Sequence, residues 1–218
     1  MRTLLSAAAI FVVSAGASYA ADASRAANNI WSGFYVGAHL GKAWGETGNS
    51  WRNIPAGYPD WERDGDISDS SATGGLHAGY LWQFNSLVLG VEGDFSWMSL
   101  KGDDSQAAGF VNELEVNHIG TVRGRLGAAR ASSLFYATGG IAFTSIDKRD
   151  LTNALSASND LVGWTVGAGY EYAFGNRLRA RIEYQFVDFG SVVSGLSYDH
   201  RADDLQIHSV RAGLGYGF

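Results

Sequence analysis

Apolar and polar residues alternate with a period of two along most of the chain, from Trp31 to Phe218. Such alternation places successive side chains on opposite faces of an extended strand. Eight segments show it, namely residues 31–45, 72–84, 87–100, 114–129, 133–146, 161–174, 177–189 and 205–218. Each exceeds the ~5–6 residues of an average strand and suffices for the ~9–11 residues that cross a bilayer. The pattern predicts an all-β protein with eight long strands.

The connections between these segments alternate in length. Tight turns are expected at residues 85–86, 130–132 and 175–176, and long polar loops at 46–71, 101–113, 147–160 and 190–204. Short turns at one end and long loops at the other are typical of a membrane barrel. We therefore predict an eight-stranded antiparallel transmembrane up-and-down β-barrel over residues 31–218.

The two faces of the predicted strands differ in charge. One face carries apolar residues, for example Val116, Val122 and Leu126 in segment 114–129. The other combines small residues with charged ones, which are Glu92, Asp94, Arg123, Arg125, Glu171, Arg179, Arg181, Glu183 and Arg211. Because a soluble core would not hold arginine and glutamate among glycines, the charged face is expected to line the lumen as a network of opposite charges, and the apolar face to meet lipid.

The fifth segment does not reveal its facing. Residues 133–146 are apolar on both faces, so either Phe135 or Tyr136 can point toward lipid.

Aromatic residues elsewhere gather near the segment ends, in two groups that predict belts at the two membrane interfaces. The group beside the short turns and chain ends includes Trp31, Tyr80, Trp82, Phe84, Tyr172, Phe174, Tyr216 and Phe218. The group beside the long loops includes Trp44, Trp97, Trp164 and Phe186.

Composition narrows the class of protein further. The 218 residues include no cysteine, which excludes disulfides and thiolate metal sites, and the formal net charge of −6 argues against nucleic-acid binding. Arg2, an apolar stretch and the small residues that end at Ala20 predict a signal peptide over residues 1–20. Residues 21–30 would then form a periplasmic segment before the barrel.

Four segments carry a family resemblance. They read WSGFYVGA at residues 31–38, GGLHAGYLWQ at 74–83, LFYATGGIA at 134–142 and VRAGLGYGF at 210–218. They resemble strands of the outer-membrane β-barrel family of Gram-negative bacteria, often called the porin family, with an OmpA-like barrel. The resemblance implies an integral location in the outer membrane, with lipid and lipopolysaccharide as neighbours. It also implies that Tyr216 and Phe218 form the signal for the barrel-assembly machinery. The oligomeric state stays open.

The expected function is a structural or surface role with at most narrow porin-like permeation, because side chains fill an eight-stranded interior. No enzyme is expected, since the adjacent His208 and Ser209 point to opposite faces and cannot form a nucleophile–base pair.

The alternative is a surface ligand receptor or an adhesin that acts through the long loops. The resemblance extends to haemin-binding members of the family. Candidate ligand-binding residues are His39 and His77, on the lumen face of neighbouring strands, and Trp51, Tyr58 and Trp61 in loop 46–71. No metal or cofactor is expected, with haem at the histidine pair as the alternative.

Overall fold

The computed structural model describes residues 30–53, 58–103, 112–150, 155–175, 177–190, 192–195 and 199–218. The predicted signal peptide, and all of the predicted periplasmic segment except Ile30, lie outside these residues. Among the described residues, no helix has the length and apolar character needed to cross a membrane.

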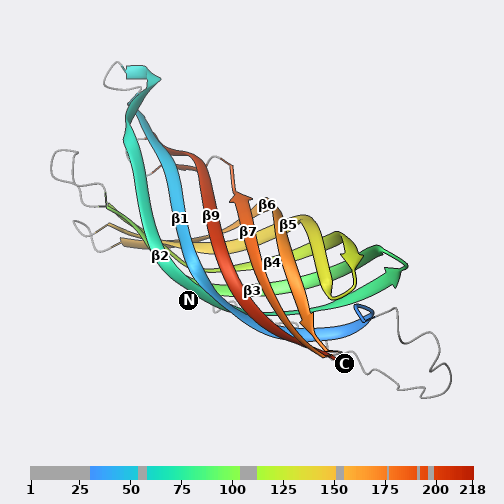
Figure 1. The fold of residues 1–218 in the computed structure, drawn as a ribbon. Coiled ribbons are helices and arrows are strands. Elements are labelled where there is room, and N and C mark those ends of the chain that lie inside the picture. The colour runs from blue at the N-terminus through green and yellow to red at the C-terminus, as the bar shows by residue number, and fades with distance from the viewer. Residues whose placement is uncertain are drawn as a thin grey trace, which may run out of the picture.

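A single antiparallel sheet closes on itself to form a barrel (Figure 1). Its strands are β1 (Gly33–Asn53), β2 (Tyr58–Phe84), β3 (Leu87–Asp103), β4 (Asn112–Arg130), β5 (Ser133–Asp150), β6 (Leu155–Phe174), β7 (Leu178–Asp188), β8 (Val192–Gly195) and β9 (Asp199–Gly217). Neighbours pair in order from β1 to β7, β7 pairs with β9, and β9 pairs with β1. The short β8 pairs with β9 alone, so eight strands form the wall and the predicted fold class is confirmed.

One end of the barrel, here called the turn end, is made by tight connections. Asn85 and Ala131 adopt φ values of 58° and 51°, and Gly175 adopts 73°. Positive φ in a short connection matches the right-handed twist of two antiparallel strands. The opposite end, here called the hairpin end, carries the longer connections.

The predicted long loops are partly wrong, because strand pairing continues through them. Within loop 46–71, β1 and β2 remain paired from Glu46 opposite Ser68 out to Asn53 opposite Tyr58, with two register irregularities on the way. Figure 1 shows this hairpin rising beyond the rest of the barrel. Residues 46–71 are mostly polar and have no apolar face, so the alternation could not predict these parts of β1 and β2. Backbone hydrogen bonds between neighbouring strands form without an apolar face.

The outer surface of the barrel is apolar. Exposed side chains include Leu40, Leu76, Val122, Leu126 and Leu214, and they follow the predicted lipid-facing parity. The open question of β5 is resolved, since Phe135 is 64% exposed on the outside whereas Tyr136 is 5% exposed inside.

Val116 does not face lipid as its parity predicted. Its side chain is 2% exposed and lies inside the barrel, as does Ile119. The pairing of β4 with β5 shifts between Val116 and Gly120, where β4 holds an extra residue. Such a bulge reverses the facing of everything beyond it, so a parity that holds for Val122 fails for Val116.

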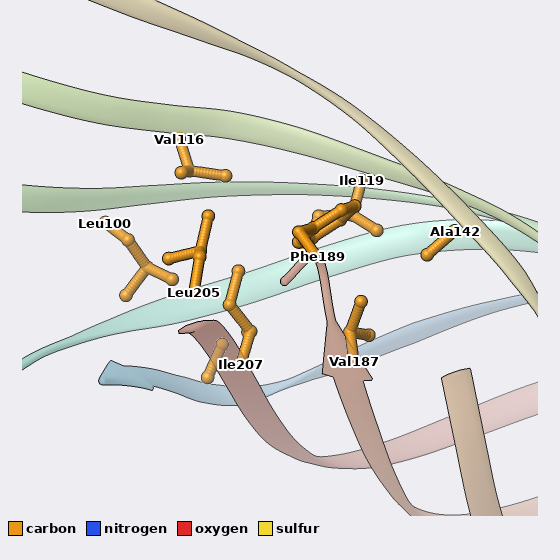
Figure 2. Packing of buried hydrophobic residues seen from close by; sticks show 9 residues of the cluster. Leu100, Val116, Ile119, Ala142, Val187, Phe189, Leu205 and Ile207 are labelled. Carbon is orange, nitrogen blue, oxygen red and sulfur yellow. The ribbon is translucent and has the colours of Figure 1, made fainter. Parts of the chain in front are cut away.

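Two apolar clusters fill the two ends of the lumen. The cluster toward the hairpin end consists of Ala43, Leu100, Val116, Ile119, Ala142, Val187, Phe189, Leu205 and Ile207. Figure 2 shows these side chains converging from several strands. Phe189 follows the last residue of β7 and its backbone N–H donates to the carbonyl of Leu205 at 3.0 Å, which holds the ring over the lumen.

The cluster toward the turn end consists of Trp31, Tyr35, Leu81, Val88, Leu134, Tyr136 and Ala173. Trp31 was predicted to join an interfacial belt, and this is wrong. Its side chain is fully buried inside the barrel, with the Arg179 guanidinium 5.0 Å from the ring centroid. The Arg179 Nη2 donates to the carbonyl of Ile30 at 3.1 Å, so the segment before β1 turns inward and closes this end.

We predict that Val122→Arg, which places a cation on the lipid-facing side near the middle of β4, lowers the free energy of unfolding by ~2–4 kcal/mol, the usual penalty at a bilayer midplane. Urea unfolding of the barrel in phospholipid vesicles measures it. Ser86→Arg, in an exposed turn, is the control and should change it by about 0.5 kcal/mol or less. Equal effects of the two variants would contradict the lipid-facing assignment.

Candidate functional site

A layer of charged side chains fills the lumen between the two apolar clusters. It contains all the residues of the predicted charge network, and each is buried: Glu92, Asp94, Arg123, Arg125, Glu171, Arg179, Arg181, Glu183 and Arg211. Strict alternation along β3, β4, β6, β7 and β9 turns them inward, while the residues between them face out. The structure therefore brings the sequence-predicted residues together in one place.

Arg123 is the central link of this layer. From β4, its Nη1 donates to Glu183 on β7 at 2.7 Å, and its Nη2 donates to Glu92 on β3. All three side chains are 0% exposed. One guanidinium thus binds a glutamate on the neighbouring strand β3 and, through the interior of the barrel, a glutamate on β7, which is not a neighbour of β4 in the sheet.

The two glutamates each accept several hydrogen bonds. Glu92 accepts from Tyr35 at 2.6 Å, from Arg181 at 2.6 Å and from Arg125 at 3.2 Å, in addition to Arg123. Glu183 accepts from the Tyr136 hydroxyl at 2.7 Å, and Arg211 also donates to it. Buried carboxylates are tolerable when charge and hydrogen bonds compensate them in this way.

The layer extends in both directions along the barrel axis. Toward the hairpin end, Arg211 donates to Asp94 at 3.0 Å. Toward the turn end, Arg125 donates to Glu171 at 2.7 Å, and Arg179 lies 3.9 Å from the same carboxylate. The ion pairs form a continuous layer from one apolar cluster to the other.

The predicted His39–His77 pair exists, but the two residues are diagonal neighbours rather than directly opposite. His39 pairs with Gly75 in the sheet, and His77 pairs with Gly37. The rings stack with centroids 5.9 Å apart, and the Nε2 of His39 lies 3.0 Å from the Ser96 hydroxyl. Both histidines are buried in the lumen, at 2% and 4% exposure.

The histidine pair does not fit haem or a metal ion. A Cβ on Gly37 would lie 2.5 Å from the Cε1 of His77, which shows how closely this ring lies against the wall. A ring pressed against the strands leaves no open face for a porphyrin beside its nitrogen. The described residues also hold no group of three or more His, Cys, Asp or Glu side chains placed to bind a metal.

The other candidate residues are distributed over both ends of the barrel. Trp51, Tyr58 and Trp61 lie on the projecting part of β1 and β2, where the structure describes the backbone but not the side chains. Tyr216 and Phe218 point outward at the turn end, with their rings 5.4 Å apart. Their role in assembly stays a prediction.

Sequence reasoning missed the two tyrosines that complete the charged layer. Tyr35 and Tyr136 lie on the lumen face and donate to Glu92 and Glu183. Their ring faces also receive Arg125, whose Cζ lies 3.9 Å from the Tyr136 ring centroid. Tyr35 lies between the outward Phe34 and Val36, so the alternation could have predicted that it faces the lumen. The facing of Tyr136 could not be derived, because its segment is apolar on both faces.

We predict that Arg123→Gln lowers the free energy of unfolding by about 3–5 kcal/mol, because it leaves two buried carboxylates with less compensating charge. The measurement is urea unfolding in phospholipid vesicles. Arg130→Gln makes the same chemical change at an exposed position of the same strand and should shift the value by about 0.5 kcal/mol or less. A loss of similar size in both variants would show that Arg123 is not the central link.

Comparisons with known proteins agree with this geometry. The chain matches the family model "Outer membrane protein beta-barrel domain" over residues 6–218. It is 33% identical over 201 residues to the 31 kDa outer-membrane immunogenic protein of Brucella melitensis, which covers 86% of this chain and 84% of that protein. It is 32% identical over 173 residues to the 22 kDa outer membrane protein of Rhizobium leguminosarum, with 78% and 79% covered.

A solved structure shows the same fold. The outer membrane protein OprG from Pseudomonas aeruginosa matches with a TM-score of 0.57 at 16% identity, over 86% of this chain and 96% of that chain. The fold and the sequence relatives together place this protein in the outer membrane. The chain belongs to the outer-membrane β-barrel protein family.

Proposed function

We propose that this protein is a structural, surface-displayed barrel whose lumen is closed to ions and solutes and whose projecting hairpin carries its interactions. The observation that carries this proposal is the layered lumen. A charged layer with side chains at 0–4% exposure lies between two apolar clusters, and each cluster closes one end. An ion would have to displace Trp31 or Phe189 and then separate buried ion pairs.

The projecting hairpin is the part of the described chain best placed to meet external partners. In outer-membrane barrels the short turns face the periplasm and the longer connections face the exterior. The hairpin of β1 and β2 extends outward to the pair Asn53–Tyr58, and Trp51 and Trp61 belong to it. The Brucella relatives are named immunogenic, and we infer that in this chain the projecting hairpin is the segment that antibodies reach.

No catalytic role is part of the proposal. His208 lies on the outside, where its Nδ1 is 2.7 Å from the Tyr184 hydroxyl, while the adjacent Ser209 is buried in the lumen. The barrel wall therefore separates this histidine from the serine beside it.

We predict that the refolded protein shows no discrete conductance steps in a planar lipid bilayer, because its lumen is filled along its length. Insertion is checked independently by the heat-modifiable mobility of the folded barrel in gels. Reproducible steps that Glu92→Gln or Arg123→Gln changes in size would contradict the closed lumen and favour narrow porin-like permeation.

We predict that the hairpin is a major antibody target on intact cells. Residues 49–65 are replaced by Asn-Gly, which joins Gly48 to Asp66 where the two already pair. An antiserum against the full barrel is absorbed with this shortened barrel and then applied to intact cells that display the full barrel. Antibodies that remain should still bind these cells. Complete removal of binding by the shortened barrel would contradict the proposal, provided that it folds to a heat-modifiable form.

A further inference from the structure

Lys42 is an exposed cation on the lipid-facing side of the barrel. It follows the outward parity of Leu40 and Trp44 on β1. Within the part of the chain that the structure describes, no carboxylate forms an ion pair with it. The charged layer of the lumen points inward and is paired, whereas Lys42 is exposed on the outward face, where a molecule outside the chain can reach it.

The depth of Lys42 favours a lipid headgroup as that partner. β1 begins at Gly33, and a tilted strand crosses the hydrocarbon in ~9–11 residues. Lys42 and Trp44 therefore lie near the boundary of the membrane at the hairpin end, which faces the exterior in this class of barrel. There a lysine costs far less than at the centre of the bilayer, and its flexible side chain reaches the level of the phosphates.

A rigid aromatic platform lies beside Lys42. Trp44 on β1 stacks on His208 of β9, with ring centroids 5.7 Å apart and an interplanar angle of 8°. Phe186 of β7 contacts the same imidazole at 4.9 Å between centroids, and the Tyr184 hydroxyl lies 2.7 Å from its Nδ1. In the tautomer in which that hydroxyl donates to Nδ1, the Nε2 of His208 carries the hydrogen and offers a second donor on this face.

The sheet register sets the spacing of the two donors. Lys42 pairs with Val210, and Trp44 pairs with His208. Lys42 and His208 are thus diagonal neighbours on the outward face of adjacent strands, at about 7–8 Å. A tetrahedral phosphate between a long lysine and an imidazole matches this spacing.

An apolar hollow lies on the same outward face, closer to the centre of the membrane, and its lining residue on β1 nearest to Lys42 is Ala38, four positions away along the strand. It has a volume of about 880 Å³, and its lining includes Ala38, Leu76, Ala78, Gly93, Phe95 and Leu214. Ala38 pairs with both Leu76 and Leu214, so the hollow spans the strands on which Lys42 and His208 lie. Small residues at Ala38, Ala78 and Gly93 leave room for a chain of methylene groups.

We propose that this face binds a phosphate-bearing lipid of the outer leaflet, with its phosphate at Lys42 and His208 and an acyl chain in the hollow. Lysine is a suitable point charge for a phosphate, and the hollow is apolar as an acyl chain requires. The site rests on the membrane location of the barrel and is independent of the proposed function of the hairpin.

The experiment measures lipid retained by the purified barrel, by native mass spectrometry after incubation with phosphatidic acid, with diacylglycerol, or with inorganic phosphate as competitor. The wild-type barrel should retain phosphatidic acid in preference to diacylglycerol. Lys42→Gln should weaken retention about fivefold, as expected for one lysine at a lipid surface. Lys42→Arg should restore it, while Arg130→Gln, which removes an exposed cation at the turn end, should have no effect.

A second pair of variants tests the hollow. Gly93→Leu fills it, whereas Gly124→Leu adds the same side chain outside it. Both glycines face outward, and an added Cβ would meet only a carbonyl oxygen, at 4.0 Å and 3.8 Å respectively. Gly93→Leu should lose retained lipid and Gly124→Leu should keep it.

Three results would overturn the proposal. Equal retention by Lys42→Gln and the wild-type barrel would remove the role of Lys42. Full competition by inorganic phosphate would indicate a site for free phosphate instead of a lipid. A change in oligomeric state with Gly93→Leu, without loss of lipid, would show that a second copy of the chain occupies the hollow.

Discussion

The arrangement of this barrel depends on one guanidinium. Arg123 binds Glu92 on the neighbouring strand β3 and reaches across the lumen to Glu183 on β7, and all three side chains are sealed from solvent. Water cannot replace either partner at this depth, so each charge needs the others. The reach of one arginine side chain also suits the narrow interior of eight strands, since a wider barrel would separate these walls.

Two further features surround that layer, namely the apolar clusters at the two ends of the lumen and the apolar outer surface of the barrel. Trp31 belongs to the apolar cluster at the turn end and Phe189 to the one at the hairpin end, so the charged layer lies between two apolar clusters. Outside, the apolar belt leaves Lys42 as a cation at the membrane boundary. The charges inside the barrel thus pair with one another, whereas the proposed partner of Lys42 outside is a lipid phosphate.

Period-two alternation was sufficient to predict the closed barrel and the membership of the charged layer. It failed at Val116, because a bulge inserts one extra residue into β4 and so reverses which side chains face the lumen. The alternation of apolar and polar residues does not show where such a bulge lies. Trp31 was misplaced because an aromatic residue near a strand end is equally compatible with a lipid interface and a buried plug. The offset between His39 and His77 depends on strand register, which parity alone does not supply.

The inward-facing arginines also bear on how the chain enters the membrane. Arg123 meets Glu183 sixty positions along the chain, and Phe218 at the end donates its backbone N–H to Phe34 near the beginning. A half-built sheet would expose bare guanidinium groups to hydrocarbon, at a cost of several kcal/mol each. The cost of inserting the early strands is therefore offset only when the late strands join the sheet and supply the partners of these arginines.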